Sequence, residues 1–133
     1  MRIIVGGLGR KTGKTTLVCR IIALSRDRQW TAVKISHHQP PGGAPYSLQA
    51  DDAAGDTRRF REAGAHRTFW LQGDLASALP DLKALLADTP NWIVESGAAL
   101  RHLEHDFALL AVDPAHIEDE KVLGLLDRGE VDG

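Results

Sequence analysis

The chain has 133 residues, 43% of them hydrophobic and 26% charged, which is typical of one soluble globular domain. Its net charge of −2 argues against nucleic acid or an anionic membrane as a partner held by charge, and no apolar run reaches the ~18 residues of a membrane span. The single cysteine, Cys19, excludes an intramolecular disulfide and fits a reducing compartment, so we expect one cytoplasmic domain over residues 1–133.

Predicted strands and helices alternate along the chain. In chain order, the apolar patterns predict a strand at 3–5, a helix at 15–26, a strand at 30–36, a helix at 56–63, a strand at 66–71, a helix at 74–88, strands at 92–94 and 107–112, and a weaker helix at 117–126. Asp56 is the expected N-cap of the second helix and Gly64 its end. Pro80 either kinks the third helix or marks its true first turn.

The segment at 36–55 is rich in Pro, Gly and polar residues, and it predicts a long loop of the kind that usually serves a function. The strand segments are continuous apolar runs, which is typical of strands buried on both faces of a parallel sheet. Strands of this kind alternating with helices predict an α/β fold, in which a mostly parallel sheet is covered by helices on both faces as three layers.

The segment GGLGRKTGKTTLV, residues 6–18, lies between the first strand and the first helix. Glycines let a backbone wrap closely around a phosphate, and the N-terminus of the following helix adds partial positive charge. This order predicts a P-loop, and with it a P-loop NTPase-like fold that forms a single nucleotide-binding domain. Leu8 stands where the pattern G-x-x-x-x-G-K-[ST] has its first glycine. Gly7 and Gly9 flank it, and the P-loop class typified by dethiobiotin synthetase has its first glycine where Gly7 stands.

Two residues of this loop have predicted chemical roles. Lys14, the candidate catalytic residue, would reach the β- and γ-phosphates of a nucleotide, and the Thr15 hydroxyl would bind Mg²⁺. Arg10 and Lys11 either add positive charge beside the phosphates or are solvated side chains. The complete set of predicted nucleotide-binding residues is Gly7, Gly9, Arg10, Lys11, Thr12, Gly13, Lys14, Thr15 and Thr16.

Two carboxylates are candidate Mg²⁺ ligands beside Thr15. Glu95 ends a buried strand, where a side chain faces the crevice in which open α/β sheets bind ligands. Its alternative role is to cap a helix or loop. For Asp56, the N-cap role is a complete explanation by itself, and metal binding is the alternative. One carboxylate with Thr15 would suffice, because Mg²⁺ keeps several waters and phosphate oxygens as ligands.

Three further residues are possible ligand or partner contacts. Lys34, inside a predicted strand, should face the ligand crevice or pair with a buried acid. His37 and His38 open the long loop, where they could contact a phosphate, a pterin-type partner or a metal, position a water, or be ordinary polar loop residues. His102 and His105 suggest zinc, but no second pair of ligands completes a tetrahedral set, so we reject that interpretation.

The ordered motifs resemble the MobB family, the GTP-binding adaptors of molybdopterin-guanine dinucleotide biosynthesis. The resemblance covers residues 2–113 and has four parts: the P-loop segment, VKISHH at 33–38, DTRRFREAGA at 56–65 and IVESG at 93–97. The chain departs from the family at Gln39, which replaces an acidic residue, and at Ser96, which replaces a glycine. It also has no N-K-x-D motif, so the choice of GTP over ATP depends on the resemblance alone.

The resemblance implies an adaptor with weak NTPase activity that uses Mg²⁺ and GTP (or ATP) in molybdenum cofactor biosynthesis. It also implies the molybdopterin guanylyltransferase as the partner, and the small size suggests a homodimer. A P-loop ligase or kinase of the dethiobiotin synthetase-like class, which would transfer phosphate from ATP to a small metabolite in the 37–55 loop, is the alternative. A shortened domain that binds nucleotide without turnover is a third possibility.

Overall fold

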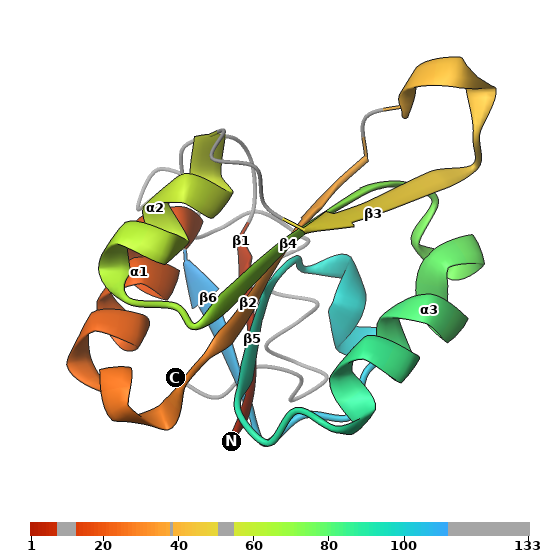
Figure 1. Ribbon diagram of the computed structural model, residues 1–133. Coiled ribbons are helices and arrows are strands. Elements are labelled where there is room, and N and C mark those ends of the chain that lie inside the picture. Colours follow the sequence, from red (N-terminus) through yellow and green to blue (C-terminus); the bar gives the residue numbers. More distant parts are fainter. Residues whose placement is uncertain (8–12, 38, 51–54, 112–133) are drawn as a thin grey trace, which may run out of the picture.

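The computed structural model describes residues 1–7, 13–37, 39–50 and 55–111 (Figure 1). Its strands are β1 (Arg2–Gly7), β2 (Thr31–Ser36), β3 (Tyr46–Ala50), β4 (Arg67–Gly73), β5 (Trp92–Glu95) and β6 (Phe107–Ala111). Its α-helices are α1 (Lys14–Leu24), α2 (Gly55–Ala63) and α3 (Leu75–Ala87), and short 3₁₀ helices occupy Arg26–Arg28, Pro41–Gly43 and Ala98–Arg101. No helix in this described part is long and apolar enough to cross a membrane.

The six strands form one sheet in the order β3-β4-β2-β5-β1-β6. Every neighbouring pair is parallel except β3 and β4, which are antiparallel. The expected α/β class and mostly parallel sheet are therefore confirmed.

Helices lie on both faces of this sheet, as expected (Figure 1). Helices α1 and α2 cover one face, over a buried cluster that includes Val5, Ile22 and Phe60. Helix α3 covers the other, over a cluster that includes Val33 and Leu82. The architecture is therefore three-layered.

The sequence prediction misses strand β3. This strand lies within the 36–55 segment, which was expected to be a loop. The strand has five residues at the edge of the sheet, and none of them is fully buried. Alternate side chains, such as Ser47 and Gln49, are polar. What orders the strand is its ladder with β4, in which Leu48 is aligned with Leu71. That pairing is non-local, so a short edge strand of this kind gives little signal in a window of sequence.

The helix boundaries differ from expectation at two points. Helix α1 ends at Leu24 and not at residue 26, because the backbone of Ser25 is not helical, with φ −143° and ψ 51°. The Ser25 carbonyl instead accepts a hydrogen bond of 3.1 Å from the Trp30 indole. Helix α2 begins at Gly55, so Asp56 lies in its first turn and is not the predicted N-cap. Gly64, with a φ of 118°, ends that helix as predicted.

Helix α3 begins at an N-cap, Asp74, whose carboxylate accepts a hydrogen bond from the Ser77 backbone N–H at 3.2 Å. Pro80 therefore lies inside the helix and does not mark its first turn. Of the predicted elements, the last residue of the 107–112 strand and the helix at 117–126 lie outside the described residues.

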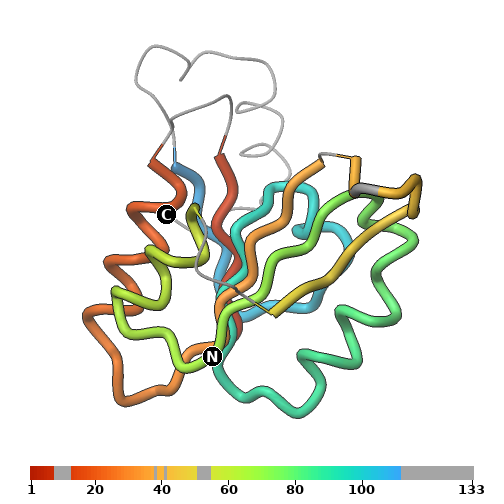
Figure 2. Tube along the Cα trace, turned by 45° about the horizontal axis from the view of Figure 1, so that its top comes forward, coloured from red at the N-terminus to blue at the C-terminus, as the bar shows by residue number. Residues whose placement is uncertain are grey.

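The carboxyl ends of the parallel strands lie together at one end of the molecule, with the start of α1 (Figure 2). Strand β5 lies between β1 and β2, so the chain crosses over β5 when it runs from β1 through α1 to β2. In an open α/β sheet, the crevice outside these carboxyl ends is where ligands bind. The fold therefore places the ends of β1, β2 and β5 around one location.

Candidate functional site

Four predicted site residues meet at the carboxyl ends of the strands. Lys34 on β2 is aligned with Glu95, the last residue of β5. Thr15 lies in the first turn of α1, and Asp56 lies in the first turn of α2. Because aligned residues of parallel strands point to the same face of a sheet, Lys34 and Glu95 both lie on the face that α1 and α2 cover.

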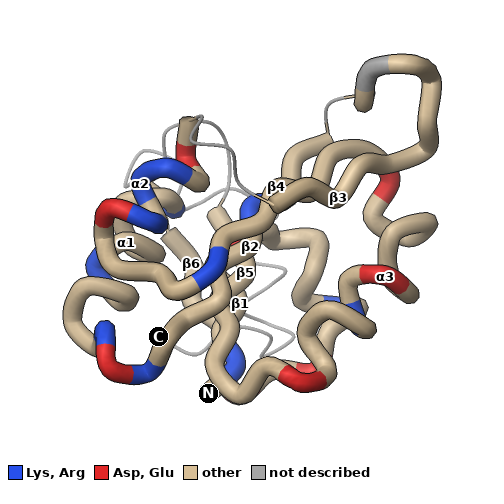
Figure 3. Tube along the Cα trace, in the orientation of Figure 1, with Lys and Arg blue, Asp and Glu red and all other residues tan. Residues whose placement is uncertain are grey.

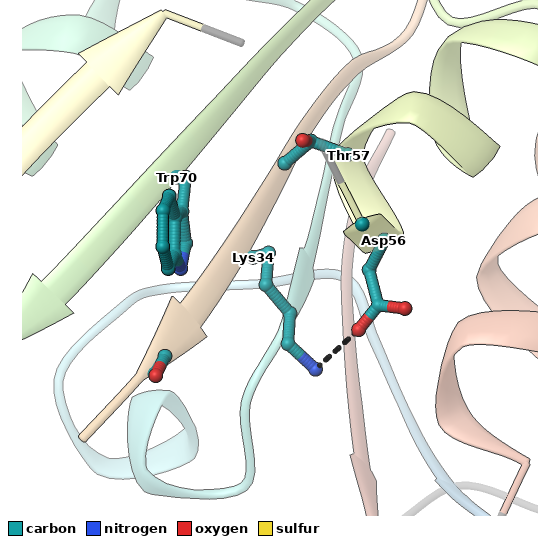
Figure 4. Close-up of a pocket in the computed structure, with 6 residues that line it drawn as sticks. Lys34, Asp56, Thr57 and Trp70 are labelled. Carbon is teal, nitrogen blue, oxygen red and sulfur yellow. Dashed lines mark ion pairs between the residues drawn. The ribbon is translucent and has the colours of Figure 1, made fainter. Parts of the chain in front are cut away.

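These four side chains form one connected polar network. The Thr15 hydroxyl donates a hydrogen bond of 2.5 Å to Glu95 Oε1. The Lys34 ammonium donates to the other carboxylate oxygen, Glu95 Oε2, and lies 3.1 Å from Asp56 Oδ2 (Figure 4). Glu95 is thus the buried acid that the sequence requires for a lysine inside a strand.

Burial and charge together fix the protonation state of Lys34. Burial alone lowers the pKa of its ammonium group, but the hydrogen bond and charge of Glu95, and then those of Asp56, outweigh that effect and raise the pKa above its ordinary value. The Glu95 side chain is 0% exposed, against 22% for Lys34. A charge buried this completely is costly without a partner, so the cation on Lys34 compensates Glu95 at neutral pH.

The donor atoms of the site suit Mg²⁺ better than a softer metal. Thr15, Asp56 and Glu95 offer only oxygen atoms, which are the ligands that Mg²⁺ prefers. Within the described ranges, no three His, Cys, Asp or Glu side chains come together as a ligand set, and this includes His102 and His105. A metal at this site would therefore be held by few protein oxygens, together with waters and ligand phosphates.

The described ends of the predicted P-loop are the end of a strand and the start of a helix, in the order that the sequence predicts. Gly7 is the last residue of β1, and Gly13 immediately precedes α1 with a left-handed backbone at φ 85° that favours glycine. Lys14 then opens the helix, and it forms no ion pair with any residue that the structure describes. The hydroxyl of Thr16 accepts a hydrogen bond of 3.1 Å from Arg59 on α2.

Several predicted residues are not part of the observed network. His37 follows β2 and is exposed, so its role stays a prediction. The remaining predicted site residues, which lie outside the described ranges, are Gly9, Arg10, Lys11, Thr12 and His38.

The end of β1 touches the segment after β5 through two glycines. A Cβ atom added to Gly6 would lie 3.0 Å from the Gly97 Cα, whereas one added to Gly97 would lie 4.0 Å from the Gly6 Cα. Neither residue has a positive φ. The close approach therefore favours glycine at residue 6, where a side chain would push the Gly97 backbone away by a few tenths of an ångström, but it tolerates a side chain at residue 97.

We expect Gly6→Ala to lower the free energy of unfolding by about 1 kcal/mol relative to Gly97→Ala, because its added methyl group would press against the Gly97 backbone. Both changes remove a similar amount of backbone freedom from the unfolded chain, so the second variant is a matched control. Urea unfolding followed by circular dichroism measures the difference. Equal stability of the two variants would contradict the close approach.

A pocket of about 260 Å³ adjoins this network and was not foreseen from the sequence (Figure 4). Its lining residues are Lys34, Ser36, Gly55, Asp56, Thr57 and Trp70. The sequence places Trp70 in a strand, but its position beside Lys34 follows from the register of β2 with β4, in which these two residues are aligned. A pairing between strands separated by a helix leaves no local signal.

Charges elsewhere on the molecule are mixed. Acidic and basic residues are interspersed along the described chain, and α2 carries both signs (Figure 3).

In comparisons with known proteins, no family model matches the chain, and no curated protein is similar enough to it to count as a relative.

Proposed function

We propose that the chain is a P-loop nucleotide-binding adaptor with weak NTPase activity, and that it acts with Mg²⁺ and GTP in the maturation of the molybdenum cofactor. The observation that carries the nucleotide part is the contact between Thr15 and Glu95. These residues are 80 positions apart in sequence, and each was predicted independently as a Mg²⁺ contact. Their meeting where β5 ends and α1 begins supports a shared metal–phosphate site.

Different residues would bind the phosphates, neutralise their charge and hold the metal. The backbone N–H groups of residues 7–16 would hold the phosphates, and Lys14 would neutralise the negative charge that develops on the γ-phosphate. Thr15 and Glu95 would hold the metal, with Asp56 as a further acid at the edge of the site. Bound Mg²⁺ would supply charge neutralisation between the β- and γ-phosphate oxygens.

The pathway and the partner depend on the resemblance to the MobB family. That resemblance supports GTP as the nucleotide, the molybdopterin guanylyltransferase as the partner and a homodimer as the working form. The exposed His37 and the neighbouring His38 would belong to the surface that meets this partner or its ligand.

The pocket next to Lys34 favours one second candidate, a kinase or ligase that transfers phosphate to a small metabolite. Isothermal titration calorimetry with GTP and ATP, with and without Mg²⁺, tests nucleotide binding. Product assays then separate the two functions. ADP formation that a metabolite stimulates supports the enzyme, and slow GTP hydrolysis that ignores added metabolites supports the adaptor. No binding of either nucleotide would contradict both.

A further inference from the structure

Trp70 differs from the other two tryptophans of the chain. Trp30 and Trp92 are 1% and 3% exposed and belong to the two hydrophobic clusters. Trp70 is only partly buried and lines the 260 Å³ pocket. Figure 4 shows its indole ring nearly edge-on, beside the Lys34 side chain. A large aromatic surface is therefore available inside a pocket instead of being used up in the core.

Most of the pocket surface is apolar, but two charged side chains lie near this indole. The Lys34 ammonium is a hydrogen-bond donor, the Asp56 carboxylate is an acceptor, and the two groups lie 3.1 Å apart. Glu95 on the far side of Lys34 adds a second negative charge, so these three side chains carry one positive and two negative charges. The pocket thus combines a flat apolar surface with a paired donor and acceptor.

These properties select among classes of ligand. An alkyl chain would cover the indole but would desolvate Lys34 and Asp56 without offering hydrogen bonds, which is costly. A simple anion would make no use of the indole and would be repelled by the two carboxylates. A planar ring that carries N–H donors and ring-nitrogen or carbonyl acceptors can stack on the indole and satisfy both polar groups at its edge.

We propose that this pocket binds a planar, amino-substituted nitrogen heterocycle, stacked on Trp70 with its polar edge toward Asp56 and Lys34. The volume of about 260 Å³ lies just below the roughly 300–1,000 Å³ of sites for drug-sized ligands. That size suits a single fused-ring system such as a purine or a pteridine.

The pocket lies apart from Gly7, where β1 ends and the predicted phosphate loop begins. Trp70 is on β4, and β5 and β2 lie between β4 and β1. Three steps of about 4.8 Å across the sheet separate β1 from β4 by roughly 14 Å. The ring could therefore be the base of a nucleotide whose phosphates occupy the loop, or it could belong to a second small molecule.

The test uses the full chain and three probes: guanosine, adenosine and 6-methylpterin. Because Trp30 and Trp92 are buried, quenching of tryptophan fluorescence by a stacked probe should come from Trp70. We expect at least one probe to quench the wild type saturably, and Trp70→Ala to weaken its binding about 10-fold or more by calorimetry. Trp70→Phe, which keeps an aromatic face, should bind within a few-fold of the wild type. Absence of saturable binding by all three probes, or equal affinity of wild type and Trp70→Ala, would overturn the proposal.

Two additional experiments complete the test. The first shows whether the ring belongs to the nucleotide or to a second molecule, and the second distinguishes failure of this proposal from failure of the proposed function. If the probe still binds when Mg²⁺ and GTP are saturating, the site takes a second molecule; if GTP competes with the probe, the site takes the base of the nucleotide. Both results support a heterocycle site. Lys14→Ala should leave probe binding unchanged, because the pocket wall does not include Lys14. Probe binding in a chain that binds no nucleotide would therefore contradict only the proposed function.

Discussion

Lys14→Ala is expected to weaken the binding of Mg²⁺–GTP and Mg²⁺–ATP by roughly 10- to 100-fold, because hydrogen bonds to charged groups contribute about 1.5–3 kcal/mol each. Lys14 opens α1 directly after the left-handed Gly13, and no described residue forms an ion pair with it. Its charge is thus available to a ligand, and its loss should leave the fold intact. Calorimetric titration gives the affinity, and a thermal unfolding curve without nucleotide gives the stability.

Lys83 on α3 provides a matched control, since it is an exposed lysine on the opposite face of the sheet. Lys83→Ala should bind both nucleotides as the wild type does. Wild-type affinity in the Lys14→Ala chain would rule out the P-loop assignment, whereas unfolding of that chain would show that Lys14 has a structural role.

Glu95→Ala should lower the free energy of unfolding by about 3 kcal/mol, near the low end of the range for breaking a buried pair. The Glu95 side chain is fully buried, and its removal leaves the Lys34 ammonium, which is 22% exposed, with Asp56 as its remaining partner. Urea unfolding at pH 7 measures the loss. Glu62→Ala removes an exposed ion pair with Arg58 on α2 and should cost less than about 0.5 kcal/mol.

The same pair predicts a pH dependence with a definite sign. The pKa of Lys34 is raised in the folded chain, mainly because Glu95 outweighs the opposing effect of burial. Its stabilising contribution is therefore fully present below the unfolded pKa of about 10.4 and is lost only as the pH rises through the higher folded value. The stability difference between the wild type and Glu95→Ala should stay constant between pH 6 and about pH 9. A difference that shrinks within that range would contradict the assignment.

A double variant separates the structural role of Glu95 from its proposed metal role. Replacing a buried ion pair by apolar residues of similar size is often neutral, so Lys34→Met with Glu95→Leu should recover most of the lost stability. The effect of Mg²⁺ on nucleotide affinity should not recover, because the carboxylate is gone. Recovery of both properties would show that Glu95 serves only the fold.

How far the sequence predicts this molecule depends on how local each signal is. The β-branched run at Ile3–Val5 and the helical spacing after Thr15 are complete within a few residues, and both elements are present. Glu95 could be predicted as a site residue because it ends a buried strand. Its contacts with Thr15 and Lys34 needed the order of β1, β5 and β2 in the sheet, which no short window of sequence contains.

The errors have the same origin. Strand β3 exists through its ladder with β4, and Trp70 became a pocket residue through the register of β4 with β2. Asp56 looked like an N-cap because its residue type favours that role. The helix instead begins one residue earlier, and the carboxylate of Asp56 pairs with Lys34.

Lys34 connects the predicted metal site with the pocket. A single ammonium group contacts Glu95 toward the predicted metal position and Asp56 at the wall of the pocket. A divalent cation on Glu95 would compensate that carboxylate and leave the ammonium to interact with Asp56 and with whatever occupies the pocket. The two sites would then be thermodynamically linked. If the metal changes the affinity of the pocket for its ligand by some factor, that ligand must change the affinity of the site for the metal by the same factor.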